Sequence, residues 1–554
     1  MNTAVFKHKR TALALGVAWA TLCAGMLQNV QAFEFDTGNP DLRVRWDNTF
    51  RYNLGYRVEK QDDSILGNPN LDDGDRNFER GIVTNRLDIL SEADVVFRQY
   101  YGARLSAAGW YDQAYENLDN TNVATSNHLK NGRQALGLSN YADRYYNGPS
   151  GEILDAFVFG RVEAGDIPIN LKAGQHSVAW GEALLTGGSI NGVSYSQNAL
   201  DLGKAQASPG IEAKELFRPQ SQMSAQAQIT DTFSIATQYF FDWESMQLPE
   251  AGTYFGAQDV LLNGAESLVA PNRVAAVRGK DILRDNHGDW GLAVRWTPEV
   301  LQSVTFGAYY RNFTDKLPQV YQQLPAAVGQ PARFGFGYGD DIDLYGLSVS
   351  GLVGDVSVGA EVSYRTNMPL VSSAIILPAG ALPDDTPGAR GNTVHALVNA
   401  VGSMGTSSIY DTAAYSAELT WNSWTKVTQN EAVFKGRDGY TAVDQAEKGA
   451  LALALNFTPT WFQVFPGGDL SLPVSFAQGL HNNSAVTSGG NQGTGSYSVG
   501  VGLDYLSQYR FDLKYVDFFG DVDKGANGAV TANNGTNAIL KDRGLITLTF
   551  KTTL

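Results

Sequence analysis

The sequence has very little cysteine and, after its first 32 residues, no long apolar run. Its one cysteine, Cys23, lies within that N-terminal stretch, so the remaining chain has neither a thiol nor a disulfide. No later segment reaches the roughly 18 consecutive apolar residues that a membrane-spanning helix needs. Basic residues are scarce as well, with 41 Lys and Arg against 57 Asp and Glu. This balance argues against nucleic-acid binding, because phosphate contacts need Lys and Arg.

Catalytic motifs are also missing. There is no His-Glu-x-x-His and no Gly-x-Ser-x-Gly, and the histidines beyond the N-terminal stretch are scattered. We therefore predict no enzymatic activity and no cofactor, with a barrel hydrolase that gathers Ser, His and Asn from separate strands as the alternative. The run from Asn68 to Glu79 resembles a calcium-binding loop, but Gly74 stands one place late, which favours an ordinary solvated loop.

The N-terminus has the pattern of a secretory signal. Lys7, Lys9 and Arg10 precede an apolar run over residues 11–27, and Val30-Gln31-Ala32 forms a small-residue cleavage site. We predict a signal peptide at residues 1–32 and one domain over residues 33–554. Removing three basic and no acidic residues takes the formal charge from −16 to −19.

Strict alternation of apolar and polar residues dominates the chain beyond this signal. Residues 43–56 place Val44, Trp46 and Tyr52 on one face and Arg45 and Arg51 on the other. The last eleven residues, 544–554, alternate in the same way and end the chain on an apolar residue. A period of two predicts β-strands with one apolar and one polar face.

The connections between these strands alternate in length. We predict short turns near residues 297–300, 354–355, 422–423, 466–468 and 506–508, and long polar loops near 242–285, 316–341, 367–411, 480–496 and 520–542. Short periplasmic turns and long external loops are typical of outer-membrane barrels. Backbone groups in lipid must all be paired, so the sheet has to close. The predicted fold is all-β: a closed antiparallel transmembrane β-barrel of about 18 strands (16–20), with some external loops folded into the lumen.

Polar residues on the inward faces are the candidates that line the lumen. They are Arg45, Asp47, Arg51, Asp88, Glu92, Arg104, Arg295, Arg311, Glu361, Arg365, Asp512 and Lys514. The loop at 367–411 is the candidate plug or gate, because it contains Ile375-Ile376-Leu377 and a stripe at helical spacing that includes Leu397 and Val398. The alternative is that these apolar residues pack on the barrel rim.

Several motifs together resemble one family. They are Asp-Asp-Gly-Asp-Arg-Asn-Phe at 72–78, Asn-Arg-Leu-Asp at 85–88, Ala-Ala-Gly-Trp-Tyr-Asp at 107–112, Trp-Gly-Glu at 180–182, Gly-Gly-Ser-Ile-Asn at 187–191, Pro209-Gly210 with Lys214-Glu215, and the closing strand. Over nearly its whole length the chain is similar to the bacterial outer-membrane family named domain of unknown function 1302. The family-motif candidates are Asp73, Gly74, Asp75, Arg76, Trp110, Asp112, Trp180, Gly181 and Glu182. The chain departs from the family pattern at Gly174-Gln175-His176 and at Tyr195-Ser196-Gln197-Asn198.

The resemblance implies a function and partners. It implies a Gram-negative outer-membrane channel or transporter for small hydrophobic compounds, such as lipids, sterols or hydrocarbons. The implied partners are a periplasmic lipid-carrier-like protein and an inner-membrane pump of the resistance-nodulation-division type, besides the barrel-assembly machinery and outer-membrane lipid. The alternatives are a general porin for polar solutes, a barrel hydrolase and a structural or adhesive surface barrel.

Overall fold

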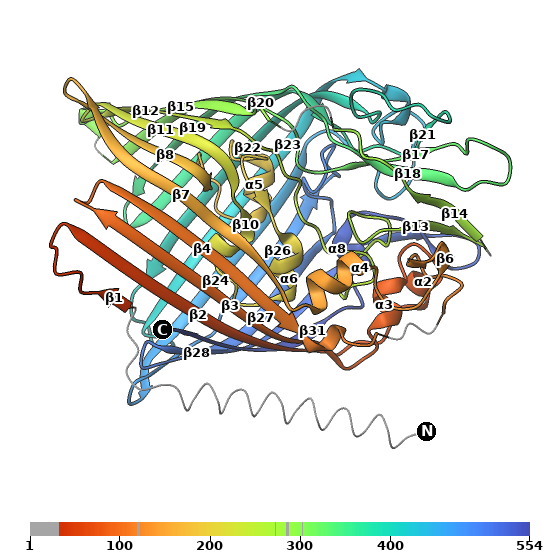
Figure 1. Cartoon of the computed structure of the whole chain (residues 1–554), viewed down its shortest axis with the longest axis horizontal. Helices are drawn as coiled ribbons and strands as arrows, with labels where there is room; N and C mark the ends of the chain where they lie inside the picture. The colour runs from red at the N-terminus through yellow and green to blue at the C-terminus, as the bar shows by residue number, and fades with distance from the viewer. Residues whose placement is uncertain (1–32, 119–121, 272, 284–286, 302) are drawn as a thin grey trace.

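A ring of antiparallel strands forms the wall of the molecule (Figure 1). The computed structural model describes residues 33–118, 122–271, 273–283, 287–301 and 303–554. The predicted signal peptide at residues 1–32 lies outside these ranges. Within them the wall has 18 transmembrane strands, which bears out the predicted fold class.

The wall strands follow one another around the ring in chain order. They are β2 (Leu42–Arg57), β3 (Ile82–Phe97), β4 (Tyr101–Asp112), β7 (Ser150–Ala164), β8 (Ile167–His176), β11 (Gln220–Thr230), β12 (Phe233–Phe240), β15 (Trp290–Trp296), β16 (Val304–Phe313), β19 (Ile342–Val353), β20 (Val356–Pro369), β22 (Arg390–Met404), β23 (Thr412–Gln429), β24 (Ala450–Phe465), β25 (Gly468–Ser471) with β26 (Val474–His481), β27 (Gly495–Tyr505), β28 (Tyr509–Phe519) and β31 (Leu545–Thr553). β25 and β26 together form one wall strand, because both lie between β24 and β27.

The first and last wall strands close the barrel. β31 pairs antiparallel with β2, from Thr49 opposite Thr553 to Arg57 opposite Leu545. Beyond this ladder, the backbone N–H groups of Asn48 and Leu554 donate to each other's carbonyl oxygens. The short strand β1 (Phe33–Phe35) pairs with the start of β2. Closure leaves the wall without a free edge, as a lipid environment requires.

The two ends of the barrel differ. Short turns, such as 98–100, 165–166, 231–232, 354–355 and 506–508, lie at the end where the described chain starts and stops, on the left of Figure 1. Long connections gather at the opposite end. By the usual rule the first end faces the periplasm and the second faces outward. The predicted turn at 422–423 was wrong, because those residues lie inside the long strand β23 and the turn is at 405–411.

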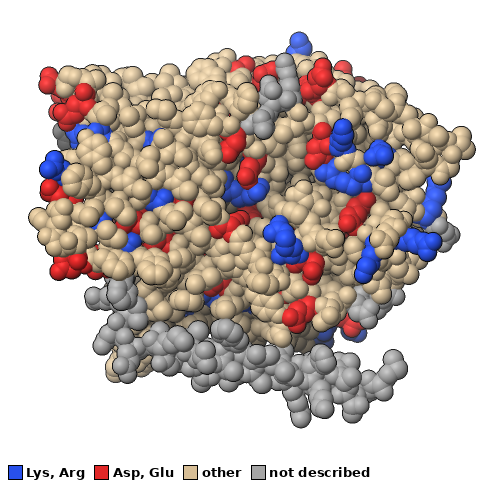
Figure 2. Space-filling view, in the orientation of Figure 1, with Lys and Arg blue, Asp and Glu red and all other residues tan. Residues whose placement is uncertain are grey.

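The outer face of the wall is apolar. Leu347, Ile153 and Val398 are 57–59% exposed on it. Exposed aromatic residues form a band near each end: Tyr56, Tyr239, Trp290, Tyr345 and Tyr497 at the outer end, and Trp46, Phe97, Tyr101, Trp296 and Tyr505 at the periplasmic end. Figure 2 shows large uncharged areas on the wall, with charged side chains at its left edge and over the external loops on the right. Apolar wall and aromatic bands together match a lipid bilayer and its two interfaces.

The external loops form a dome over the outer mouth. Its elements are α2 (Asp63–Leu66), α3 (Asp73–Asn77), η1 (Gln113–Tyr115), β5 (Leu129–Lys130), β6 (Arg133–Gln134), α4 (Asn140–Ala142), η2 (Asp143–Asn147), β13 (Ser267–Ala270), β14 (Arg273–Arg278), β17 (Gln319–Gln323), β18 (Ala332–Gly337), β21 (Ile375–Leu377), η4 (Glu431–Val433), β29 (Val522–Lys524), β30 (Val530–Asn533) and α8 (Thr536–Ile539). One further short helix, η3 (Glu299–Leu301), lies in a periplasmic turn. No helix in the described ranges is long and apolar enough to cross a membrane.

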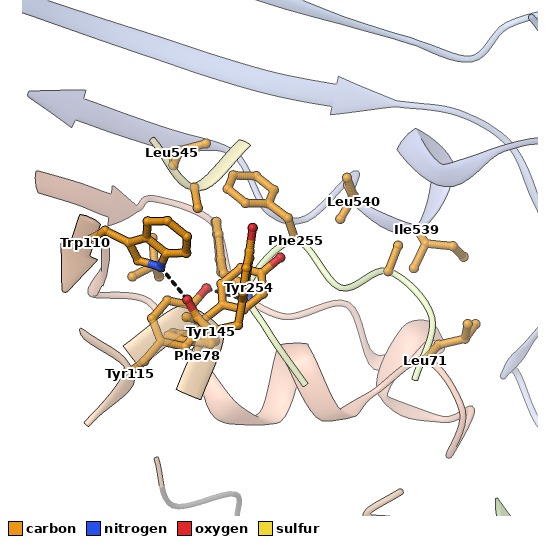
Figure 3. Close-up of a cluster of buried hydrophobic side chains, with 14 of the residues drawn as sticks. Leu71, Phe78, Trp110, Tyr115, Tyr145, Tyr254, Phe255, Ile539, Leu540 and Leu545 are labelled. Carbon is orange, nitrogen blue, oxygen red and sulfur yellow. Dashed lines mark hydrogen bonds between the residues drawn. The ribbon is translucent and has the colours of Figure 1, made fainter. Parts of the chain in front are cut away.

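Apolar and aromatic side chains from distant loops hold the dome together. Figure 3 shows Phe78, Tyr115, Tyr145, Tyr254 and Phe255 packed together beside the wall residue Trp110. The indole N–H of Trp110 donates to the carbonyl of Tyr145, at 2.5 Å. A separate five-stranded sheet, in the order β13-β14-β18-β17-β21, extends the dome outward. The dome therefore has a core of its own rather than a set of independent loops.

Candidate functional site

Residues 177–219, which connect β8 to β11, form the candidate site, and we name them the lumenal segment. They contain α5 (Thr186–Asn191), β9 (Ala199–Leu200), α6 (Leu202–Ala207), α7 (Ala213–Leu216) and β10 (Phe217–Arg218). Figure 1 shows α5, α6 and β10 inside the ring of strands. The segment leaves the wall at its outer end, folds into the lumen and returns to the same end, and it contacts both inward-facing wall residues and the dome above.

Two glutamates of the wall hold the first half of the segment by its backbone. Glu361 accepts hydrogen bonds from the N–H groups of residues 182, 183 and 193, the last at 2.7 Å. Glu418 accepts from residues 184, 185 and 188, at 2.8, 3.1 and 2.9 Å. Hydrogen bonds from N–H groups to carboxylates are about twice as strong as neutral ones. Each carboxylate therefore fixes a tight turn of the segment.

Glycine permits this close approach. A Cβ atom on Gly188 would overlap the carboxylate oxygens of Glu418, and one on Gly181 would overlap the carboxylate of Glu361. Gly181 also has a φ of +88°, in the region that favours glycine. Gly181 of the Trp-Gly-Glu motif and Gly188 of the Gly-Gly-Ser motif are thus required by close contact with carboxylates of the wall.

Two arginines hold the next turn by its carbonyls. Arg311 on β16 donates to the carbonyl oxygens of Val193 and Tyr195, at 3.0 and 2.5 Å. Arg365 on β20 donates to the carbonyl of Gly192, at 2.9 Å. Trp180 packs beside them against Tyr309, with 6.5 Å between ring centroids.

The second half of the segment binds the other side of the lumen. Arg51 on β2 forms a bidentate ion pair with Glu215, at 2.8 and 3.0 Å. The hydroxyl of Ser208 donates to Asp88 on β3, at 2.8 Å. Two lysine–glutamate pairs flank these contacts, Lys214 with Glu92 and Lys551 with Glu212. The segment therefore bridges the lumen from the β16–β23 side to the β31–β3 side.

Burial shows how completely the segment fills this level. The inward-facing side chains Arg51 and Glu418 are only 1% exposed although they lie on different sides of the barrel. Towards the periplasmic end, by contrast, the inward-facing residues Arg45, Arg295 and Ser357 are exposed. The lumen is thus occupied in its outer part and opens into a water-accessible vestibule at the periplasmic end.

The dome and the lumenal segment are joined by buried polar groups. Asp201 of the segment accepts a hydrogen bond from the hydroxyl of Tyr145, and the carbonyl of Gln247 accepts from the N–H of Leu202, at 2.8 Å. Glu250, completely buried in the 241–289 loop, accepts hydrogen bonds from the side chain of Gln247 and from Gly264 N–H. Burial raises the pKa of Glu250 to about 8. At neutral pH this carboxyl is therefore largely protonated.

All lumen-lining candidates stand on inward-facing positions of their strands. Arg51, Asp88, Glu92, Arg311, Glu361 and Arg365 contact the lumenal segment directly. The others lie away from it: Arg45 pairs with Asp47, Arg104 pairs with Glu92, Asp94 and Asp155, Asp512 pairs with Arg510, and Arg295 and Lys514 face the lumen from β15 and β28.

The family-motif candidates fall into three places. Asp73, Gly74, Asp75 and Arg76 lie in α3 of the dome, where a Cβ on Gly74 would overlap the carbonyl oxygen of Thr253. Trp110 and Asp112 end β4 just beneath the dome, and Trp180, Gly181 and Glu182 begin the lumenal segment. These motifs thus join the dome, the wall and the segment.

The calcium alternative at residues 68–79 gains no support from the structure. Asp75 lies between Arg57 and Arg543, at 2.8 and 3.5 Å. No group of three or more His, Cys, Asp or Glu side chains in the described ranges is arranged to hold a metal ion.

The prediction of a helical plug in the 367–411 loop was wrong. Leu397 and Val398 lie in the wall strand β22, where Leu397 faces inward, 2% exposed, and Val398 faces outward. Ile375, Ile376 and Leu377 form β21 of the dome sheet, with Ile375 buried against Tyr321 and Ile282. Helical spacing misled here because the apolar Leu397 faces the lumen and the small residues Ala396 and Ala400 share the outward face with Val398, which obscures the alternation. The sequence interpretation did not identify the segment at 177–219 as the element in the lumen.

One contact bears on the hydrolase alternative. His176 shares a hydrogen bond of 2.8 Å with the hydroxyl of Ser224, both on the inner wall. The other ring nitrogen of His176 contacts the backbone carbonyl of Gly174, at 3.0 Å, rather than a carboxylate or amide side chain. The pair therefore lacks the third member that orients the base in a catalytic triad.

Comparisons with known proteins give one family and several similar structures. The family model described as "Protein of unknown function (DUF1302)" matches residues 13–554. No curated protein matches the chain. Similar structures include OccAB4 of Acinetobacter baumannii (9% identity, TM-score 0.43, covering 92% of this chain and 98% of that one) and OpdK of Pseudomonas aeruginosa with vanillate (9%, 0.40, 92% and 98%). Another is OmpF of Salmonella typhi in complex with daunomycin (8%, 0.36, 94% and 100%).

Proposed function

The chain belongs to the DUF1302 family, and we propose that it is an outer-membrane channel kept closed by its lumenal segment. Small, mainly hydrophobic compounds pass when this segment moves. The observation that carries the proposal is the bridge across the lumen, in which the segment is bound to carboxylates and arginines on both sides of the wall.

The contacts of the segment argue for a regulated opening. Six backbone N–H groups on two carboxylates, together with the ion pairs of Arg51, Lys214 and Lys551, resist spontaneous displacement. Each hydrogen bond to a charged group contributes about 1.5–3 kcal/mol. Opening therefore needs free energy from a bound compound or from a partner. We propose a periplasmic carrier-like protein and an inner-membrane pump of the resistance-nodulation-division type in that role, acting through the vestibule.

A general porin for polar solutes is the second candidate, and burial argues against it. A wide aqueous lumen would leave inward-facing side chains wet along the whole wall. Here His395 and Arg365 are completely buried at the level of the segment.

Locking the segment to the wall tests the proposal. The amide of Asn53 on β2 donates to the hydroxyl of Ser208, at 3.1 Å. Asn53→Cys with Ser208→Cys, joined by a short bis-methanethiosulfonate linker, ties the segment down, and the predicted mature chain offers no competing thiol. Each single cysteine variant is the control. Cells that carry the barrel are compared for entry of the hydrophobic dye Nile red, and proteoliposomes for swelling in arabinose.

We expect the linked double variant to block dye entry, reductant to restore it, and arabinose swelling to stay slow throughout. Fast swelling in the wild type would favour the general porin. Dye entry that the linker leaves unchanged would refute a moving segment.

A further inference from the structure

Arg311 and Arg365 are buried cations that contact no carboxylate directly in the described ranges. They are 1% and 0% exposed, and neither forms an ion pair within the part of the chain that the structure describes. Asp289 acts on Arg311 only through longer-range electrostatics. Asp315 and Glu361 act on Arg365 in the same way.

Arg51, on the other side of the lumen, is equally buried but has Glu215. A buried charge is strongly disfavoured unless it is paired. Arg311 lies over the ring of Phe313 and Arg365 over the ring of Tyr195. Such contacts offset only part of the cost of burial, so the two guanidiniums need a further explanation.

The two arginines lie in one row across the wall. Arg311 on β16 stands opposite Leu344 on β19, and Leu344 stands opposite Arg365 on β20. Both guanidinium groups reach the same turn of the lumenal segment, residues 192–195. Two inward-facing positions, two strands apart, thus direct positive charge to one place.

Several donors at this place have no acceptor among the residues that the structure describes. They are Nε and Nη1 of Arg365, Nε of Arg311, and the hydroxyl of Ser363, which is two residues from Arg365 on the same face of β20. Buried polar groups are nearly always satisfied, and an arginine carries five N–H donors. The carbonyls of residues 192, 193 and 195 satisfy only part of this capacity.

We propose that Arg311, Arg365 and Ser363 form a binding site for an oxyanion, a carboxylate or a phosphate ester, at the head of an otherwise apolar compound. In the closed state three neutral carbonyls of the lumenal segment take the place of the anion's oxygens. The surroundings suit an apolar remainder, because Phe313, Ile342 and Leu344 are buried next to the arginines.

This inference deepens the proposed function, on which it rests, because the anion reaches the arginines only when the segment moves. An oxyanion can accept two parallel N–H groups of a guanidinium in a bidentate ion pair, and it adds the attraction between opposite charges, neither of which a carbonyl oxygen offers. The compound therefore competes with residues 192–195 for the same donors. Binding of the compound and release of the segment are one event.

Equilibrium binding to the purified full-length barrel tests the site. Octanoate, octyl phosphate and octanol share one apolar chain and differ in the head group, and calorimetry measures the affinity of each. Arg311→Gln and Arg365→Gln are the test variants. Arg104→Gln is the matched control, because Arg104 is an inward-facing arginine with three acidic partners. Hydrogen exchange of residues 184, 185, 188 and 193 reports on the segment.

We expect both anions to bind the wild type at least tenfold more tightly than octanol and to speed exchange of the segment. Each test variant should lose at least tenfold in affinity for the anions, and Arg104→Gln should not. If one anion alone binds, the preference identifies carboxylate or phosphate as the head group. If a Gln variant does not assemble, the Lys variant keeps the charge but loses the planar fork, and a loss of affinity is still expected.

Octanol binding as tightly as octanoate in the wild type would overturn the inference, as would anion binding that the arginine variants leave intact. Neither result would touch the proposed channel, since the linker experiment is independent of any anion. Conversely, if anions bind but the linker does not block dye entry, the anion site stands and the claim that the segment closes the channel fails.

Discussion

Glu418→Ala should release the first turn of the lumenal segment. Glu418 is 1% exposed and accepts three backbone hydrogen bonds from residues 184–188. Each bond to a charged acceptor contributes about 1.5–3 kcal/mol, so the three together give about 4–9 kcal/mol. Water that enters the space left by the side chain can accept some of these hydrogen bonds and so restores part of the lost free energy. We therefore expect the closed state to lose about 3–5 kcal/mol relative to the open state, on the same per-bond scale.

A loss of that size changes the open population by about two to four orders of magnitude, since each 1.4 kcal/mol is about a factor of ten. Glu418→Gln keeps one acceptor oxygen and the same shape, so its effect should be smaller, about 1–2 kcal/mol. Asp512→Ala is the control, because Asp512 faces the lumen but pairs with Arg510 instead of the segment.

Two measurements track the change. Planar-bilayer recordings should show frequent large openings for Glu418→Ala, fewer for Glu418→Gln and none beyond the wild-type rate for Asp512→Ala. Hydrogen exchange at residues 184, 185 and 188 should speed up in the same order. If exchange accelerates while conductance stays at the wild-type level, the segment is anchored as described but does not close the channel. If neither changes, the anchoring argument itself is wrong.

Three further variants test the wall, its closure and the dome. Leu554→Asp places a charge where the last residue pairs with Asn48, so we expect less heat-modifiable barrel in outer-membrane fractions than for wild type. Val501→Arg, on the lipid face at 44% exposure, should lower stability by about 2–4 kcal/mol in urea titrations in bilayers, whereas Val501→Ile should not. The pKa of Glu250, raised by burial to about 8, makes the folded dome bind a proton that the unfolded chain releases near its ordinary pKa of 4.5. Dome stability should therefore fall as pH rises from about 4.5 to about 8, by at most about 5 kcal/mol. We expect trypsin to cleave the 241–289 loop faster at pH 8 than at pH 6. The Glu250→Gln variant should remove this pH dependence.

The wall could be predicted from the sequence because its signal is local. Along β2 each residue contacts either lipid or lumen, so alternation is readable residue by residue, and Arg51 is placed inward without knowledge of its partner. The failures have local causes too. Asn422-Ser423 has turn-forming residues, yet lies inside the 18-residue strand β23, where Asn422 is buried and donates to Asn191 and to the carbonyl of Gly489.

The lumenal segment could not be predicted because its stabilising contacts are distant in sequence. Arg51 and Glu215 are 164 positions apart, and Gly188 and Glu418 are 230 positions apart. Nothing in Gly-Gly-Ser-Ile-Asn indicates that its backbone must approach a carboxylate on another strand. The family resemblance drew attention to these residues, but only the packed structure gives the reason for them.

The closing ladder between β2 and β31 also joins two anchors of the lumenal segment. Arg51 on β2 stands opposite Lys551 on β31, and the two bind Glu215 and Glu212 of the segment. They form a common surface only where the first and last wall strands are paired. A barrel that fails to join its two ends therefore leaves the end of the segment without half of this surface.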